Sequence, residues 1–178
     1  GIASFDQELC YGETPNDITL TGATGNALWQ ESDDGFSWTY ISEATGATLS
    51  NALIGPLTDT TYYRAEVSNG ICPPIYSSVV AINVAPVSIG GTASSDQTIC
   101  YGETPADITL TGYTGTIQWQ QSPDGTSNWT DISSATSATL SSSQIGPLTA
   151  VTYYRAVVTS GACPSDISNT VTITINTP

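Results

Sequence analysis

The sequence predicts an all-β protein made of two tandem antiparallel β-sandwich domains. Short segments that alternate apolar and polar residues are separated by turn residues roughly every 8–12 positions, which is typical of sandwiches. Thr, Val, Ile and Tyr favour extended backbone, and no segment sustains the period of about 3.6 residues expected of an amphipathic helix. The chain of 178 residues also repeats itself after about 90 residues.

The repeat is nearly exact in places. Residues 10–22 return as residues 100–112 with one difference, because Asn16 becomes Ala106. Trp38 returns as Trp129, one position later than the earlier motifs predict, so the second copy has a one-residue insertion in its Asp-Gly turn. We expect the first domain to span residues 1–85 and the second residues 86–178.

Each copy contains seven segments with the pattern of a strand. In the first copy they are residues 2–9, 17–21, 26–31, 39–41, 47–50, 61–68 and 77–84. Successive side chains of a strand point to opposite faces, so Trp29 and Tyr63 are predicted to lie in the core with their small neighbours. Trp119 and Tyr154 take the same places in the second copy.

Two features make the predicted sandwiches immunoglobulin-like. Trp29 occupies the place of the core tryptophan on the third strand. Tyr63 follows Leu57 by six positions at the start of a strand, which resembles a tyrosine corner, where the hydroxyl bonds back to the upstream backbone.

The four cysteines, two in each copy, predict disulfides and therefore an exported protein. The duplicated spacing favours Cys10–Cys72 and Cys100–Cys163. Pairing across the two domains and buried free thiols are the alternatives.

Composition excludes several classes of function. The chain has 16 Asp and Glu, two Arg, no Lys and no His, with a formal net charge of −14. Such a surface repels nucleic acid and anionic lipid, and no apolar run approaches the length of a membrane span. Without His or Lys, neither a Ser-His-Asp triad nor a Schiff base can form, so we expect no enzyme activity.

The motifs together resemble a known family. Cys-Tyr-Gly-Glu-Thr-Pro, two tryptophans around Asp-Gly, Gly-Pro-Leu-Thr and Thr-Tyr-Tyr-Arg-Ala occur in the same order in both copies. This order resembles the immunoglobulin-like (PKD-like) repeats of very large cell-surface proteins of the Bacteroidota. The resemblance implies export by the type IX secretion system, a place on the bacterial cell surface, a role in adhesion or gliding motility, and neighbouring repeats of the same chain as partners. Since Gly1 already lies inside a repeat, we expect the sequence to be part of a longer exported protein.

Two groups of residues are candidates for ligand binding. Trp38 and Trp129, with Tyr40, Tyr62 and Tyr153, form a candidate outward strip for stacking on the sugars of surface glycans; the alternative is that they pack on one another and on Arg64 or Arg155. The acidic turn residues are candidate Ca²⁺ ligands, or else they shape hairpin turns: Asp33, Asp34 and Asp124.

These observations leave three hypotheses. The chain is a non-catalytic repeat module that acts as a spacer or adhesive segment, a carbohydrate-binding pair, or a spacer stiffened by calcium. Partners would be the neighbouring repeats, surface glycans or other surface proteins.

Overall fold

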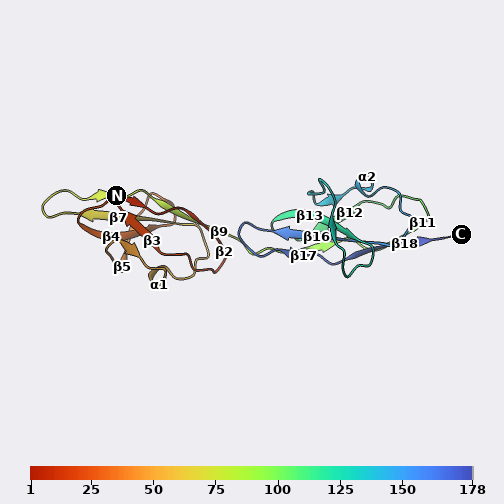
Figure 1. Cartoon of the computed structure of the whole chain (residues 1–178), viewed down its shortest axis with the longest axis horizontal. Helices are drawn as coiled ribbons and strands as arrows, with labels where there is room; N and C mark the ends of the chain where they lie inside the picture. The colour runs from red at the N-terminus through yellow and green to blue at the C-terminus, as the bar shows by residue number, and fades with distance from the viewer. Residues whose placement is uncertain (178) are drawn as a thin grey trace. The chain divides into compact units, whose positions relative to one another are not determined.

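The computed structural model describes residues 1–177, which form two compact units, the first spanning Gly1–Pro86 and the second beginning at Val87. Each unit is a β-sandwich, so the predicted fold class is confirmed (Figure 1). Because the two units repeat the same elements, the first is described in full and the second by its equivalents.

The first unit packs a small sheet against a large one. The small sheet has the order β1-β3-β6, and the large sheet β2-β9-β7-β4-β5, with β8 also paired to β7. The strands are β1 (Ile2–Ala3), β2 (Gln7–Cys10), β3 (Ile18–Thr21), β4 (Asn26–Ser32), β5 (Thr39–Thr45), β6 (Thr48–Leu49), β7 (Thr61–Ser68), β8 (Ile75–Tyr76) and β9 (Val80–Ala85). A single helical turn, α1 (Asn51–Ile54), connects β6 to β7.

The second unit follows the same plan. Its sheets have the orders β10-β12-β15 and β11-β18-β16-β13-β14, with β17 paired to β16. Its elements are β10 (Thr92–Ala93), β11 (Gln97–Cys100), β12 (Ile108–Thr111), β13 (Thr116–Ser122), β14 (Thr130–Asp131), β15 (Thr139–Leu140), α2 (Ser142–Ile145), β16 (Thr152–Thr159), β17 (Asp166–Ile167) and β18 (Val171–Asn176).

The core lies between the two sheets of each unit, on the faces that the sequence alternation predicts. β7 alternates buried and half-buried residues along its whole length. Trp29 and Tyr63 are fully buried there, and Trp119 and Tyr154 are fully buried in the second unit. Burial of such large side chains supplies the main driving force for folding each sandwich.

Two predicted strands differ from the observed ones. Residues 2–9 form both β1 and β2, which belong to different sheets because the chain crosses the sandwich at residues 4–6. Residues 77–84 form only β9, while the unpredicted β8 pairs with the other end of β7. Ser78, between β8 and β9, binds the end of β1 where the crossing begins, because the backbone N–H of Ala3 donates to Ser78 Oγ at 2.9 Å.

The outermost pair of the large sheet is parallel, an exception to the otherwise antiparallel pairing. β2 pairs with β9 from Gln7↔Ile82 to Cys10↔Ala85, and β11 pairs with β18 in the same register. β9 in turn pairs with the start of β7, with Thr61 opposite Ile82. Cys10, the last residue of β2, therefore lies three positions outside the first residue of β7, at the end of the sheet where β7 begins.

This register shows that the predicted disulfide pairing within each domain is wrong. Cys10 lies at the end of the unit where β7 begins, and Cys72 lies in the loop that follows β7 at the other end, as the yellow-green loop opposite β2 in Figure 1 illustrates. The eight residues of β7 alone span about 25 Å, whereas bonded cysteines have Cα atoms less than about 7 Å apart. Cys100 and Cys163 are separated in the same way by β16.

Within the described chain, Cys10 and Cys163 are disulfide-bonded, and Cys72 and Cys100 carry free, exposed thiols. The sequence prediction rested on the duplicated spacing of the cysteines, which does not record at which end of the fold each cysteine lies. The crossing between β1 and β2 instead carries Cys10 to the opposite end.

Candidate functional site

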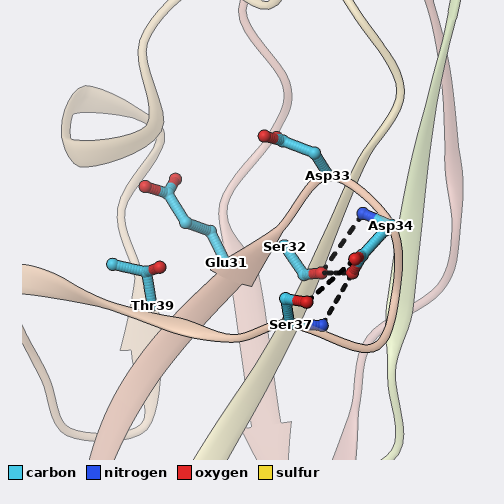
Figure 2. Close-up of a pocket in the computed structure, with 6 residues that line it drawn as sticks. All are labelled: Glu31, Ser32, Asp33, Asp34, Ser37 and Thr39. Atoms are coloured by element: carbon cyan, nitrogen blue, oxygen red, sulfur yellow. Dashed lines mark hydrogen bonds between the residues drawn. The ribbon is translucent and has the colours of Figure 1, made fainter.

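The Asp-Gly hairpin between β4 and β5 forms a hollow lined by the acidic residues that were candidates for calcium. The lining residues are Glu31, Ser32, Asp33, Asp34, Ser37 and Thr39. Figure 2 shows that the carboxylate of Asp34 points into the loop, while that of Asp33 points away from it. The two candidate carboxylates of this repeat therefore do not converge.

The carboxylate of Asp34 is occupied by its own loop. It accepts hydrogen bonds from the backbone N–H of Ser37 at 2.7 Å and from the hydroxyls of Ser32 and Ser37, both at 2.9 Å (Figure 2). The backbone N–H of Phe36 also donates to it at 2.7 Å. These bonds, first among them the one from the Ser37 backbone, hold the pKa of Asp34 well below its ordinary value. Because this carboxylate accepts four hydrogen bonds from its own loop, its role is to stabilise the turn.

Asp124 repeats the arrangement in the second unit. It accepts hydrogen bonds from Thr126 N at 2.9 Å and Ser127 N at 2.7 Å, and from the Ser122 and Ser127 hydroxyls. The hydrogen bonds from Ser127 lower its pKa strongly. The inserted residue is Asn128, which adopts a positive φ of 53° and donates to Asp124 Oδ2 at 3.1 Å. Residues 1–177 contain no group of three or more His, Cys, Asp or Glu side chains placed to hold a metal ion.

Other carboxylates also bind the backbone of their own repeat. Glu13 accepts from Cys10 N at 2.9 Å, and Asp17 accepts from Asn51 N at 2.7 Å, at the first turn of α1. The equivalent Glu103 and Asp107 make the same bonds in the second unit. The acidic composition therefore serves, in large part, to tie loops and helix starts.

The candidate aromatic strip is divided between two structural roles. Trp38 is half-buried beneath Arg64, whose guanidinium carbon lies 4.1 Å from the centre of the Trp38 ring and 4.0 Å from that of Tyr76. Arg64 Nε also donates to Gln30 Oε1 at 2.8 Å, and Gln30 is buried. The guanidinium is thus fixed between two rings and an amide, as the packing alternative predicted.

The second unit keeps half of this stack. Arg155 lies 4.1 Å from the centre of the Trp129 ring and donates to Gln120 Oε1 at 2.9 Å. Ile167 pairs with this strand where Tyr76 pairs in the first unit, so the second aromatic ring is missing.

Tyr62 and Tyr153 do not belong to these stacks. Their rings lie against the Asp-Gly turns, since a Cβ on Gly35 would lie 3.9 Å from the Tyr62 ring and one on Gly125 would lie 2.7 Å from the Tyr153 ring. Tyr40, also a candidate for the strip, is exposed on β5, and Tyr76 on β8 is an exposed aromatic residue that the sequence analysis did not select. Tyr40 donates to Glu66 Oε2 at 2.6 Å, and this bond raises its pKa.

The predicted tyrosine corner has the tyrosine but not its hydrogen bond. Tyr63 and Tyr154 are fully buried, and within the described residues neither hydroxyl has a hydrogen-bond partner. Burial raises the pKa of Tyr154 to about 12 and that of Tyr63 further.

The described residues also include no helix long and apolar enough to cross a membrane.

Comparison with known proteins supports the fold. Residues 1–86 and 89–177 each match the model of a family described as a domain of unknown function, DUF8696. A search of curated proteins finds no match.

Similar solved structures include domains A168-A170 of titin, with 12% identity, 98% of this chain and 66% of that chain covered, and a TM-score of 0.59. A marsupial T cell receptor has 12% identity, coverage of 99% and 72%, and a TM-score of 0.57. The titin fragment I67-I69 has 13% identity, coverage of 100% and 67%, and a TM-score of 0.55. The chain thus spans about two thirds of the length of the titin fragments. At such low identity the likeness shows the fold: two tandem immunoglobulin-like sandwiches.

Proposed function

The chain belongs to the DUF8696 family and carries its domain twice, and on this basis we propose that it is a non-catalytic, load-bearing repeat module of a large exported surface adhesin or filament. The family resemblance seen in the sequence supports a location for this adhesin on the surface of a gliding bacterium of the Bacteroidota. In this role the module spaces or supports an adhesive segment, and its partners are neighbouring repeats.

The observation that carries this proposal is the parallel pairing of the first long strand with the last. β2 lies close to the start of the repeat and β9 ends it, and the two run side by side over four residue pairs. A force that pulls the two ends of the repeat apart drags β2 and β9 in opposite directions along their common axis. Such shear loads the hydrogen bonds of the pair together, whereas an antiparallel hairpin pulled from its open end loses them one at a time.

The second unit has the same feature in β11 and β18, again over four pairs. The contacts of two side chains that were candidates for ligand binding also support the proposal. Asp34 and Trp38 make contacts within their own repeat, so they stabilise the module.

Force spectroscopy of the two-repeat chain in a thiol reductant tests the proposal. Each repeat should unfold in a separate step that releases roughly 250–300 Å of chain, the extended length of a repeat less its folded length. Leu9→Pro should lower the rupture force of the first repeat. Tyr11 N donates to Ala85 O, so by alternation the Leu9 N–H also faces β9, and proline removes this donor.

Glu8→Pro is the matched control, because the N–H of Glu8 faces away from β9 by the same alternation. It should lower the rupture force less than Leu9→Pro does. The second repeat of the same molecule serves as an internal reference. A rupture force that is the same in the Leu9→Pro variant and the unmodified chain would exclude the β2–β9 pair as the load-bearing element.

Glycan binding is a second proposal, favoured by one observation in the first repeat. Tyr40 and Tyr76 are about half exposed and lie on the large sheet, and Trp38 comes directly before β5 of that sheet. Glycan-array binding by the chain that Tyr76→Ala abolishes, and that Ile167→Ala in the second repeat leaves unchanged, would support it. Absence of binding to the array would reject it for the glycans displayed.

A further inference from the structure

Each repeat carries two cysteines at opposite ends. We call Cys10 and Cys100 the strand-end cysteines, because they close β2 and β11, and Cys72 and Cys163 the loop cysteines, because they follow β7 and β16. Within one repeat the two kinds are separated by the full length of an eight-residue strand. A strand-end cysteine and a loop cysteine of the same repeat therefore cannot bond to each other.

Among the described residues, one cysteine of each kind is bonded and one of each kind is free. The strand-end Cys10 and the loop Cys163 are disulfide-bonded and buried. The strand-end Cys100 and the loop Cys72 are free and exposed. Since the repeats share one fold, the bonded state of Cys10 and of Cys163 shows that each kind of position accepts a disulfide in this backbone.

The surroundings of the two free thiols are complementary in shape and polarity. Cys100 lines a shallow, mainly apolar depression with Tyr101, Asn176 and Thr177, and Tyr101 is 58% exposed. Cys72 lies next to Ile71, whose side chain is completely exposed at the tip of its loop. A protruding apolar residue beside one thiol thus matches a hollow beside the other.

We propose that Cys100 of one copy of this chain forms a disulfide with Cys72 of a second copy, which joins the copies end to end. A low-molecular-weight disulfide such as oxidised glutathione supplies the oxidation. The thiolate of one cysteine attacks it, forms a mixed disulfide and releases one glutathione thiolate; the thiolate of the other cysteine then attacks the mixed disulfide and releases the second. This inference stands independently of the load-bearing function, because it concerns how copies connect and not how each resists force.

The test begins with the intact chain, oxidised with a glutathione redox pair at about 0.5 M NaCl so that repulsion between acidic copies is screened. Non-reducing electrophoresis should show a ladder of covalent multimers that a thiol reductant collapses. Mass spectrometry of proteolytic peptides should identify the Cys72–Cys100 crosslink. Absence of the ladder, or a ladder without this crosslink, would overturn the proposal.

Two single variants establish the pairing rule. C72S retains Cys100 and C100S retains Cys72, so each alone should stop at a dimer. A mixture in which only one variant carries an affinity tag should yield mixed dimers in more than the one-half share that random pairing produces. Mixed dimers at or below that share would reject end-to-end recognition.

The contribution of the loop tip is tested by Ile71→Asp, with Phe5→Asp as the control of equal charge at another highly exposed position. Ile71→Asp should slow formation of the mixed dimer several-fold, and Phe5→Asp should not. Equal rates in the two variants would remove the depression beside Cys100 from the recognition surface.

Discussion

The buried tyrosines of β7 and β16 hold hydroxyls that make no hydrogen bond within residues 1–177. A buried polar group without a partner loses its bonds to water and gains nothing in return. Both tyrosines are fully buried among the largest side chains of their cores, so the ring contributes to stability while the hydroxyl opposes it.

Tyr63→Phe and Tyr154→Phe should therefore leave the free energy of unfolding unchanged or raise it by about 1 kcal/mol. Chemical denaturation measures this change. Tyr40→Phe is the contrasting variant, because its hydroxyl donates to Glu66 and its loss should not stabilise. A loss of more than about 1 kcal/mol in the core variants would show that the hydroxyls have a partner.

The same residues predict a dependence on alkaline pH. Burial raises the pKa of Tyr154 to about 12, so the folded state holds this proton after the unfolded chain, with a pKa near 10, has lost it. The free energy of unfolding is therefore independent of this group below about pH 10 and declines as the pH rises toward 12. Unfolding measured across this range should be less pH-dependent in the Tyr63→Phe, Tyr154→Phe double variant.

Two equivalent glycines offer a comparison at the residue scale. Gly35 and Gly125 adopt φ of 75° and 71°, which L side chains rarely adopt, so alanine at either costs about 1–2 kcal/mol. At Gly125 the new Cβ would also lie 2.7 Å from the Tyr153 ring, whereas at Gly35 the nearest ring atom is 3.9 Å away. Gly125→Ala should be the more destabilising by about 1–3 kcal/mol, as thermal denaturation of the two variants would reveal. Equal effects would mean that the Tyr153 ring moves freely.

At the scale of elements, the hairpin between β4 and β5 shows why acidic residues are frequent in the sequence. A carboxylate accepts several backbone N–H groups at once and satisfies the donors that a tight turn leaves unpaired. Asp34 and Asp124 do so in their hairpins, and Asp17 and Asp107 do so at α1 and α2. In the sequence alone, such acidic turn residues resemble the ligands of a calcium site.

Asp34→Ala should lower the melting temperature, and Asp34→Asn, which keeps one oxygen acceptor, should lower it less. The pKa of the Asp34 carboxyl lies below its ordinary value, so its contribution to stability is present above about pH 4 and is lost as the pH falls. Asp34→Ala should therefore reduce the loss of stability in acid. Equal melting temperatures in EDTA and in millimolar Ca²⁺ are expected, and a rise with Ca²⁺ that Asp34→Ala removes would establish a calcium site.

At the scale of the whole molecule, charge is the dominant feature. A net charge of −14 arises because two arginines face 16 carboxylates, and each arginine is fixed against an aromatic ring within its repeat. The remaining carboxylates repel one another, which destabilises the compact state and discourages association of copies.

Raising NaCl from about 0.01 M to about 0.5 M should therefore raise the melting temperature by a few degrees, because the screening length falls below the separation of most surface charges. Sodium sulfate, which also strengthens apolar burial, should raise it further at equal ionic strength. A melting temperature that is independent of NaCl would show that the carboxylates are already neutralised by bound cations.

The sequence by itself determined the duplication, the all-β class and the core faces. Strict alternation in residues 61–68 identified Tyr63 as inward, and the recurrence of Trp29 as Trp119 identified the third strand, because these signals depend on neighbours along the chain. It also predicted that Trp38 packs against Arg64, as one of two alternatives.

Only the tertiary structure decided where the cysteines lie. The crossing of residues 4–6 between sheets, and the parallel pairing of β2 with β9, bring together segments about 75 residues apart and carry Cys10 away from Cys72. No local pattern records which strand is the neighbour of which, since alternation is the same for parallel and antiparallel partners. Pairing is settled when the whole sheet assembles, and for that reason equal spacing in the sequence suggested two bonds that the fold does not allow.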